Sequence, residues 1–148
     1  MADWTANLVD DDAGLTRILR EARTVAVLGA KADAGAPAYY VPAYLASRGY
    51  RLRPVNPRLA GHRVLNEPVV ATLADLAEPV DVIDVFRRPE YLPAHAAEIV
   101  ALPWRPAAVW FQLGIRNDAA AATLARAGIR VVQDRCMMPE HRRLIGNG

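Results

Sequence analysis

Short apolar runs rich in valine and isoleucine alternate along the chain with segments of helical periodicity. The runs are apolar at nearly every position, which is typical of strands covered on both faces of a parallel sheet. They read TVAVLG, RLRPVNP, VDVIDVF, AAVWFQLG and IRVVQD. Between and before them the periodicity predicts helices over 38–47, 73–77, 89–101 and 118–127, and a first helix capped by Asp12 that runs to about Arg23.

This alternation predicts an α/β fold with a Rossmann-like, doubly wound parallel sheet between two helical layers, a three-layer αβα arrangement. We expect the strand order 3-2-1-4-5-6. Residues 59–72 are the least regular stretch and are expected to hold a short edge strand. A chain of 148 residues with 53% hydrophobic positions is the size of one domain, so we expect a single domain over 1–148.

Composition and charge argue against several function classes. No apolar run approaches the ~20 residues of a membrane span, and the acidic start lacks the features of a secretory signal, which predicts a cytoplasmic protein without a membrane partner. The 18 basic residues are interspersed with 16 acidic ones, which does not favour a nucleic-acid partner. One cysteine, Cys136, and the scattered His62, His95 and His141 provide neither an internal disulfide nor metal-ligand spacing.

The candidate ligand site lies beyond the carboxyl ends of the first and fourth strands, where a doubly wound sheet reverses its winding. These ends carry GAKADAGAP and FRRPE. Loop amides and the amino terminus of the helix at Ala38 would form a positive concavity for phosphate, beside Arg87 and Arg88. A charge-assisted contact is worth about 1.5–3 kcal/mol, against about 0.3–1 for the helix dipole, so the arginines would supply more of the affinity. Lys31, the only lysine, is either a further phosphate contact or a solvated loop residue.

Missing residues narrow the choice of phosphate compound. The first loop matches neither G-x-G-x-x-G nor the P-loop pattern. The second strand ends in PVNPR, without the carboxylate that holds the ribose of NAD. Asn56 can bind a base or sugar, and Arg58 can meet an additional phosphate. These features point to NADP or to coenzyme A with its 3′-phosphate.

The segments VAVLGA, YYVPAYLASRGYRLRPVNP, VDVIDVFRRPE and VWFQLGIRNDAAAATLARAGIRVVQDRCMMPEH resemble, in order and spacing, the CoA-binding protein family. Its small single-domain bacterial members resemble the CoA-binding domain of the succinyl-CoA synthetase α subunit. The resemblance implies a Rossmann-like fold that binds coenzyme A at these two loops, without implying catalysis. Family loops commonly read G-x-S and Arg-Pro-Ser-Tyr, whereas this chain has Gly29-Ala30-Lys31 and Ala36-Pro37-Ala38-Tyr39.

Several residues follow as candidates, none of them catalytic or metal-binding. Gln112 is expected to read an amide of the pantetheine arm or a base edge, and Pro42 to belong to the start of its helix. Asp81 and Asp84 are expected to have hydrogen-bonded structural roles. The full set of candidate binding residues is Gly29, Ala30, Lys31, Ala38, Tyr39, Asn56, Pro57, Arg58, Phe86, Arg87, Arg88, Gln112 and Gly114.

Three functions are compatible with these observations. The first is a non-catalytic module that binds coenzyme A or acyl-CoA. The second is a small enzyme that uses NADP or another nucleotide, which a chain too short for a separate catalytic domain makes less favourable. The third is an interaction domain that has lost its ligand. A protein partner or a homo-oligomer remains open.

Overall fold

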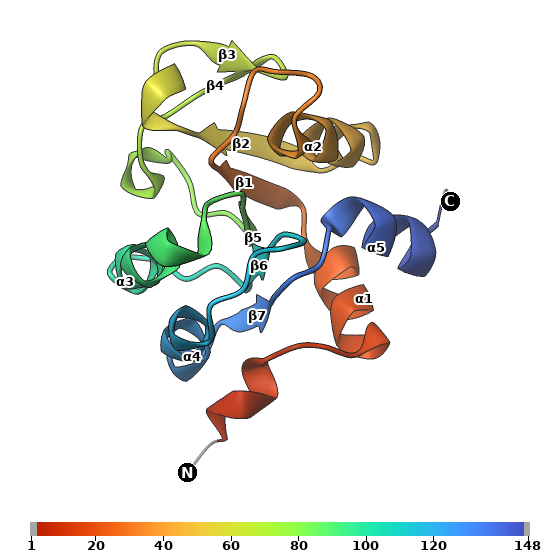
Figure 1. The fold of residues 1–148 in the computed structure, drawn as a ribbon. Helices are drawn as coiled ribbons and strands as arrows, with labels where there is room; N and C mark the ends of the chain where they lie inside the picture. Colours follow the sequence, from red (N-terminus) through yellow and green to blue (C-terminus); the bar gives the residue numbers. More distant parts are fainter. Residues whose placement is uncertain (1–2, 147–148) are drawn as a thin grey trace.

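Five parallel strands form the central sheet of the computed structural model, which describes residues 3–146 (Figure 1). The strand order is β2-β1-β5-β6-β7, and every neighbouring pair is parallel. The strands are β1 (Thr24–Leu28), β2 (Arg51–Val55), β5 (Val82–Val85), β6 (Ala108–Phe111) and β7 (Arg130–Val132).

Helices cover both faces of this sheet, which confirms the predicted Rossmann-like α/β fold (Figure 1). On one face lie α1 (Asp12–Glu21), α2 (Pro37–Ser47) and α5 (Met137–Leu144). On the other lie α3 (Leu92–Val100) and α4 (Asp118–Arg126). Short 3-10 helices span Trp4–Asn7, Pro57–Leu59, Leu73–Asp75 and Pro89–Tyr91.

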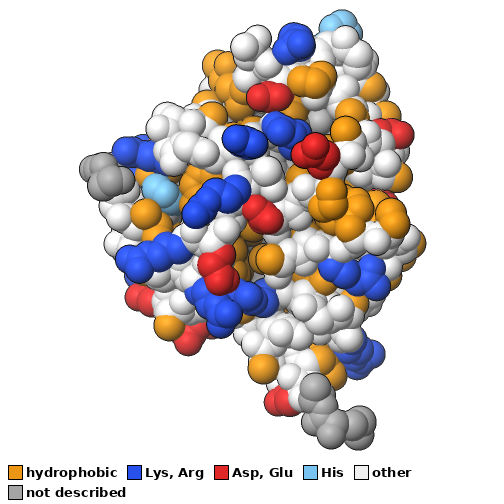
Figure 2. All heavy atoms as spheres, turned by 180° about the vertical axis from the view of Figure 1, so that it is seen from behind, with side chains coloured by type: hydrophobic (Ala, Val, Ile, Leu, Met, Phe, Trp, Pro, Cys, Tyr) orange, Lys and Arg blue, Asp and Glu red, His pale blue; other side chains and the backbone are white. Residues whose placement is uncertain are grey.

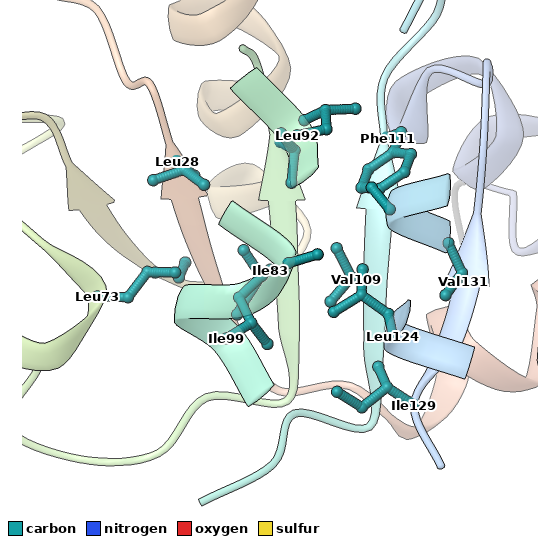
Figure 3. Close-up of a cluster of buried hydrophobic side chains, with 14 of the residues drawn as sticks. Leu28, Leu73, Ile83, Leu92, Ile99, Val109, Phe111, Leu124, Ile129 and Val131 are labelled. Atoms are coloured by element: carbon teal, nitrogen blue, oxygen red, sulfur yellow. The ribbon is translucent and has the colours of Figure 1, made fainter. Parts of the chain in front are cut away.

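Each central strand sends alternate side chains into two apolar layers. In β1, Val25 and Val27 pack toward α1, α2 and α5, whereas Ala26 and Leu28 pack toward α3 and α4. Figure 3 shows the second layer, in which leucine, isoleucine and valine side chains from the strands meet those of α3 and α4. Because both faces are covered, the strands are apolar at nearly every position, as the sequence pattern indicates.

The sheet edges differ from the sequence-based expectation. No regular third strand extends the described sheet beyond β2; that position holds an isolated parallel bridge from Val55 to Val70. Residues 59–72 instead form a two-stranded antiparallel ribbon of β3 (Arg63–Val64) and β4 (Glu67–Pro68). At the other edge, Leu8 makes a parallel bridge to Val131. Both edges are therefore capped by short chain segments, which limits edge-to-edge association.

Helix boundaries also differ from those expected. Asp11, not Asp12, caps α1, because its side chain accepts a hydrogen bond from the Gly14 amide. The expected helix over 73–77 is a single 3-10 turn that ends at Asp75. The helix expected over 89–101 is divided between the 3-10 turn at Pro89 and α3.

Pro42 lies inside α2 as its sixth residue, so its assignment to the start of the helix is wrong. Proline lacks an amide hydrogen and cannot bond the carbonyl four residues earlier, which is that of Ala38. That carbonyl lies 3.5 Å from the Lys31 amide, which donates to it. The hydrogen bond missing at Pro42 is thus replaced by one that ties the loop after β1 to the first turn of α2.

The sequence analysis did not anticipate α5, which is anchored by the buried His141. Its Nδ1 lies 2.9 Å from the Tyr44 hydroxyl, and the rings of Tyr44 and Tyr50 meet it edge-on. Burial, assisted by the positive charge of Arg48, lowers the pKa of His141 below its usual value. The imidazole is therefore held neutral in the folded protein near neutral pH.

The lowered pKa of His141 predicts a loss of stability in mild acid. The unfolded chain binds the proton at a higher pH than the folded chain does, so this contribution is present above about pH 6.5 and is lost as the pH falls through the folded pKa. His141→Gln retains a hydrogen-bonding side chain that does not titrate. Urea unfolding between pH 7.5 and 5 should show wild-type stability falling relative to that variant by at most about 1.4 kcal/mol per pH unit. If the free energies of unfolding of wild type and variant changed in parallel with pH, the lowered pKa of His141 would be contradicted.

Candidate functional site

The carboxyl ends of β1 and β5 lie next to each other and release two loops side by side. The Phe86 amide donates to the Leu28 carbonyl, and the Gly29 amide donates to the Val55 carbonyl, each over 2.9 Å. Gly29 has φ +91°, and a Cβ there would lie 2.6 Å from the Phe86 carbonyl oxygen. Only glycine meets both the positive φ and this close approach.

A cleft of about 460 Å³ opens between these loops and the end of β6. That volume is within the range of small-molecule sites. Its wall is mostly apolar, with cationic side chains from both loops. The lining residues are Lys31, Ala36, Pro37, Ala38, Tyr40, Phe86, Arg87, Arg88, Pro89, Gln112, Leu113, Ile115 and Cys136.

The structure brings six of the sequence-predicted residues together in this cleft: Lys31, Ala38, Phe86, Arg87, Arg88 and Gln112. Gly29 and Ala30 lie in the adjoining turn. Asn56 supports that turn, because its Nδ2 donates to the Ala30 carbonyl over 2.8 Å and its Oδ1 accepts from the Arg58 amide over 2.9 Å. The other predicted residues, Tyr39, Pro57, Arg58 and Gly114, do not line the cleft.

Sequence reasoning missed several wall residues, including Tyr40 and Leu113. Tyr40 is two residues after the predicted Ala38, a spacing at which helical residues do not share a face, so the periodicity did not mark it. Leu113 is 70% exposed on the loop after β6, and no pattern in the sequence marks it. Both side chains enlarge the apolar part of the wall.

The cationic groups of the cleft are differently constrained. Within residues 3–146, neither Lys31 nor Arg88 forms an ion pair. Arg87 lies 4.7 Å over the Tyr91 ring, and its Nε donates to His95 Nε2 over 3.2 Å. Because Nε2 accepts, His95 carries its hydrogen on Nδ1, which donates to Glu98 over 3.1 Å. This chain of contacts orients Arg87 while it faces the cleft.

The loop after β1 uses many of its own backbone amides. The Lys31 amide donates to the Ala38 carbonyl, the Gly35 amide to Asp33 Oδ1 and the Ala36 amide to the Asp33 carbonyl. Asp33 also places a negative charge in the loop. Fewer amides therefore remain for an anion than the sequence alone suggested, and the side-chain cations matter correspondingly more.

Behind the cleft wall lies a fully buried carboxyl group, Asp84, whose Oδ1 lies 2.5 Å from Gln112 Nε2. Burial raises the pKa of Asp84 to about 8, which its hydrogen bond to Gln112 partly opposes. Burial also raises the pKa of the Cys136 thiol, so the cysteine of the wall is a poor nucleophile at neutral pH. Asp81 accepts hydrogen bonds from the amides of Arg23 and Thr24, so both aspartates are hydrogen-bonded as expected.

A larger hollow of about 660 Å³ lies between the amino-terminal segment and α1. It includes Asp10 and Asp11 as well as Arg17 and Arg130, so its charge is mixed, and none of its lining residues comes from the loops after β1 and β5. In the described part of the chain, no group of three or more His, Cys, Asp or Glu side chains is placed to hold a metal, and no helix is long and apolar enough to cross a bilayer. Lys and Arg side chains are mixed with Asp and Glu on the face in Figure 2.

Comparisons with known proteins show the family and the fold of the chain. Residues 23–142 match the family model of a CoA binding domain. YneT of Bacillus subtilis (strain 168) is 30% identical over 129 residues, which cover 87% of this chain and 93% of YneT. Cell-free ID.343 from Thermus thermophilus has a solved structure with 51% identity and a TM-score of 0.86, over 91% of this chain and 99% of that one.

A hypothetical protein from Pyrococcus horikoshii OT3 is 30% identical, with a TM-score of 0.85 over 93% of this chain and 94% of that one. The dinucleotide-forming acetyl-coenzyme A synthetase 1 of Ca. Korarchaeum cryptofilum is 15% identical, with a TM-score of 0.62 over 74% of this chain. The match covers 25% of that enzyme, so the similarity is one of fold.

The close approach at Gly29 gives a prediction with a matched control. Gly49 has a similar φ of +95°, but a Cβ at that position would meet no atom within 4 Å, whereas Gly29 faces the Phe86 carbonyl. Gly49→Ala should cost about 1–2 kcal/mol for backbone strain alone. Gly29→Ala should cost more, because the two loops must also separate. Denaturant unfolding of both variants measures the difference, and equal losses would show that the close approach is not important.

Proposed function

This chain belongs to the CoA binding domain family, and on that premise we propose that it is a non-catalytic module that binds coenzyme A or acyl-CoA in the cleft between the β1 and β5 loops. The single observation that carries the proposal is the convergence of three cationic side chains, Lys31, Arg87 and Arg88, on one mostly apolar cleft.

The chemistry of the wall fits the parts of this ligand. Guanidinium and ammonium groups form strong charge-assisted hydrogen bonds with phosphate oxygens, so the three cations would hold the diphosphate. The apolar surface of Phe86, Leu113 and their neighbours would contact the pantetheine arm. Gln112 supplies the amide that would recognise a polar group on that arm.

The contacts first expected for the nucleotide part of the ligand are the same for NADP and coenzyme A, so the preference for coenzyme A rests on the family match. Asn56 uses both ends of its amide in holding the neighbouring turns, which removes the side chain proposed for a base or sugar of either ligand. Arg58, the candidate for a ribose phosphate, does not line the cleft.

A cytoplasmic location stays a prediction of the sequence.

A second candidate is an interaction domain that has lost its ligand. The specific observation that favours it is the first loop, where Asp33 brings a negative charge and internal hydrogen bonds occupy several amides. The two candidates differ in whether the cleft binds a phosphate compound at all.

Thermal melting in the presence of coenzyme A, acetyl-CoA, NADP and NAD tests the proposal directly. A ligand at ~100 times its dissociation constant adds ~2.7 kcal/mol, which should raise the melting midpoint by several degrees. We expect a shift with coenzyme A or acetyl-CoA and none with NAD. A shift with NADP alone would support an enzyme instead, and no shift would support the domain without a ligand.

Removing one cation should weaken binding by a predictable amount. Arg87→Ala and Arg88→Ala each delete a charged donor from the cleft, worth about 1.5–3 kcal/mol, or about tenfold to over a hundredfold in Kd. Arg20→Ala is the control, because it makes the same charge change on an exposed position of α1 outside the cleft. Isothermal titration with coenzyme A measures the three Kd values. Equal Kd values in all three variants would place the diphosphate elsewhere.

Asp33 should oppose ligand binding through its charge. Asp33→Asn keeps a side-chain oxygen that accepts from the Gly35 amide but removes the negative charge. Because the side chain is exposed, the gain should be about 0.5 kcal/mol, a two- to threefold lower Kd for coenzyme A, and it should shrink as salt is raised. Weaker binding by this variant would instead indicate that the charge helps to shape the loop.

A further inference from the structure

Asp84 is an unusual residue for the position it occupies. It lies in β5 with no exposed surface, and its Oδ2 is the one buried side-chain polar atom without a partner in the described structure. The layer around it, formed with α1, α2 and α5, is built from apolar residues such as Val82 and Trp110. An unpartnered buried polar atom is costly, and an apolar side chain at this position would avoid that cost.

The polar neighbour of Asp84 is Gln112, which also lines the cleft. The Cys136 thiol lies beside the amino end of α5, and a negative charge on Asp84 contributes to raising the pKa of this thiol. On α5, Glu140 pairs with Arg135 and Arg143, and His141 contacts Tyr44. No ion pair with Asp84 forms among the described residues.

The protonation state of Asp84 determines whether the Gln112 amide has one possible orientation or two. An ionised carboxylate only accepts, so it binds the Gln112 NH₂ group, as in the structure, and leaves the amide oxygen for the cleft. A neutral carboxylic acid can also accept from the NH₂ group through its C=O oxygen, but in addition it can donate its O–H to the amide oxygen. In that second arrangement a 180° rotation of the amide turns the NH₂ group toward the cleft. The two arrangements place nearly the same atoms in the same positions, because the oxygen and nitrogen of an amide are similar in size.

We propose that Asp84 determines ligand specificity through Gln112: its neutral form allows the amide to turn an N–H donor toward the cleft, where it binds a carbonyl group of the ligand, whereas its ionised form holds the NH₂ group and leaves only an acceptor facing the cleft. The inference rests on the proposed function for the identity of the ligand. The carbonyl belongs either to an amide of the pantetheine arm or to the thioester of an acyl-CoA. The raised pKa of Asp84 places the neutral form at physiological pH.

Binding across the titration of Asp84 tests this inference. Asp84→Asn is the matched variant, because its amide, like the neutral acid, can pair with either end of the Gln112 amide and does not ionise at any pH. The Kd values of wild type and variant for coenzyme A and acetyl-CoA are measured by titration calorimetry from pH 7 to 9.5. Ionisation of the ligand affects both proteins equally, so it cancels in the ratio of the wild-type Kd to the variant Kd. We expect the wild-type Kd to rise relative to the variant above about pH 8, approaching tenfold per pH unit.

The choice of ligand identifies the carbonyl. A rise with both ligands assigns the pantetheine amide, and a rise with acetyl-CoA alone assigns the thioester. A second pair of proteins lacks the Gln112 amide: the single variant Gln112→Met and the double variant Asp84→Asn,Gln112→Met. The ratio of their Kd values should not depend on pH, because the amide that binds the ligand is absent from both. A constant ratio between wild type and Asp84→Asn, or a pH dependence that persists without Gln112, would overturn the inference.

A measurement on the ligand-free protein separates this inference from the proposed function. NMR should show the Asp84 carboxyl carbon and the Gln112 side-chain amide titrating with one midpoint, because a single proton controls both. A Gln112 amide that does not respond while Asp84 titrates would overturn the inference even if coenzyme A binds. A shared midpoint with no binding of either CoA compound would instead support the Asp84–Gln112 coupling and reject the proposed function.

Discussion

The parallel pairing of β1 with β5 is the constraint on which the candidate site depends. It brings the carboxyl ends of two strands that are more than 50 residues apart in the sequence into register, with Leu28 opposite Val85. At the next position the backbones approach so closely that Gly29 has no room for a side chain beside the Phe86 carbonyl. The loop with Lys31 and the loop with Arg87 therefore leave the sheet together, and both reach the same cleft.

The site distributes its binding groups differently from a glycine-rich phosphate loop. In such a loop, unpaired backbone amides and a helix amino terminus hold the anion. Here Pro42, inside α2, cannot donate to the Ala38 carbonyl, which accepts from the Lys31 amide instead, and Asp33 accepts from the amides of Gly35 and Ala36. The loop gains internal order and loses donors. In the proposed binding mode side-chain cations would compensate, and among them Arg87 is held by contacts with His95 and Tyr91.

Much of this architecture could be predicted because apolar periodicity and turn residues are local signals. The five sheet strands and the pairing of the first with the fourth predicted strand follow from them. The sequence did not reveal α5, because its stability comes from the contacts of His141 and Met137 with distant segments. The expected edge strand beyond β2 is present only as one bridge, from Val55 to Val70, because strands within residues 59–72 pair with each other in an antiparallel ribbon.

The candidate site was less predictable than the fold, for the same reason. Residue type and position at a strand end correctly suggested that Lys31, Arg87 and Gln112 lie together, but they do not reveal which polar groups are already satisfied within the protein. Asn56 is an example: nothing in the sequence marks its amide as occupied, yet both of its ends hold neighbouring turns. Asp84 is the opposite case, because its carboxyl group is hydrogen-bonded as expected through one oxygen but keeps the other unpaired in an apolar layer. Packing alone would favour an apolar residue there, so the buried carboxyl is best explained by the cleft residue that it contacts, Gln112.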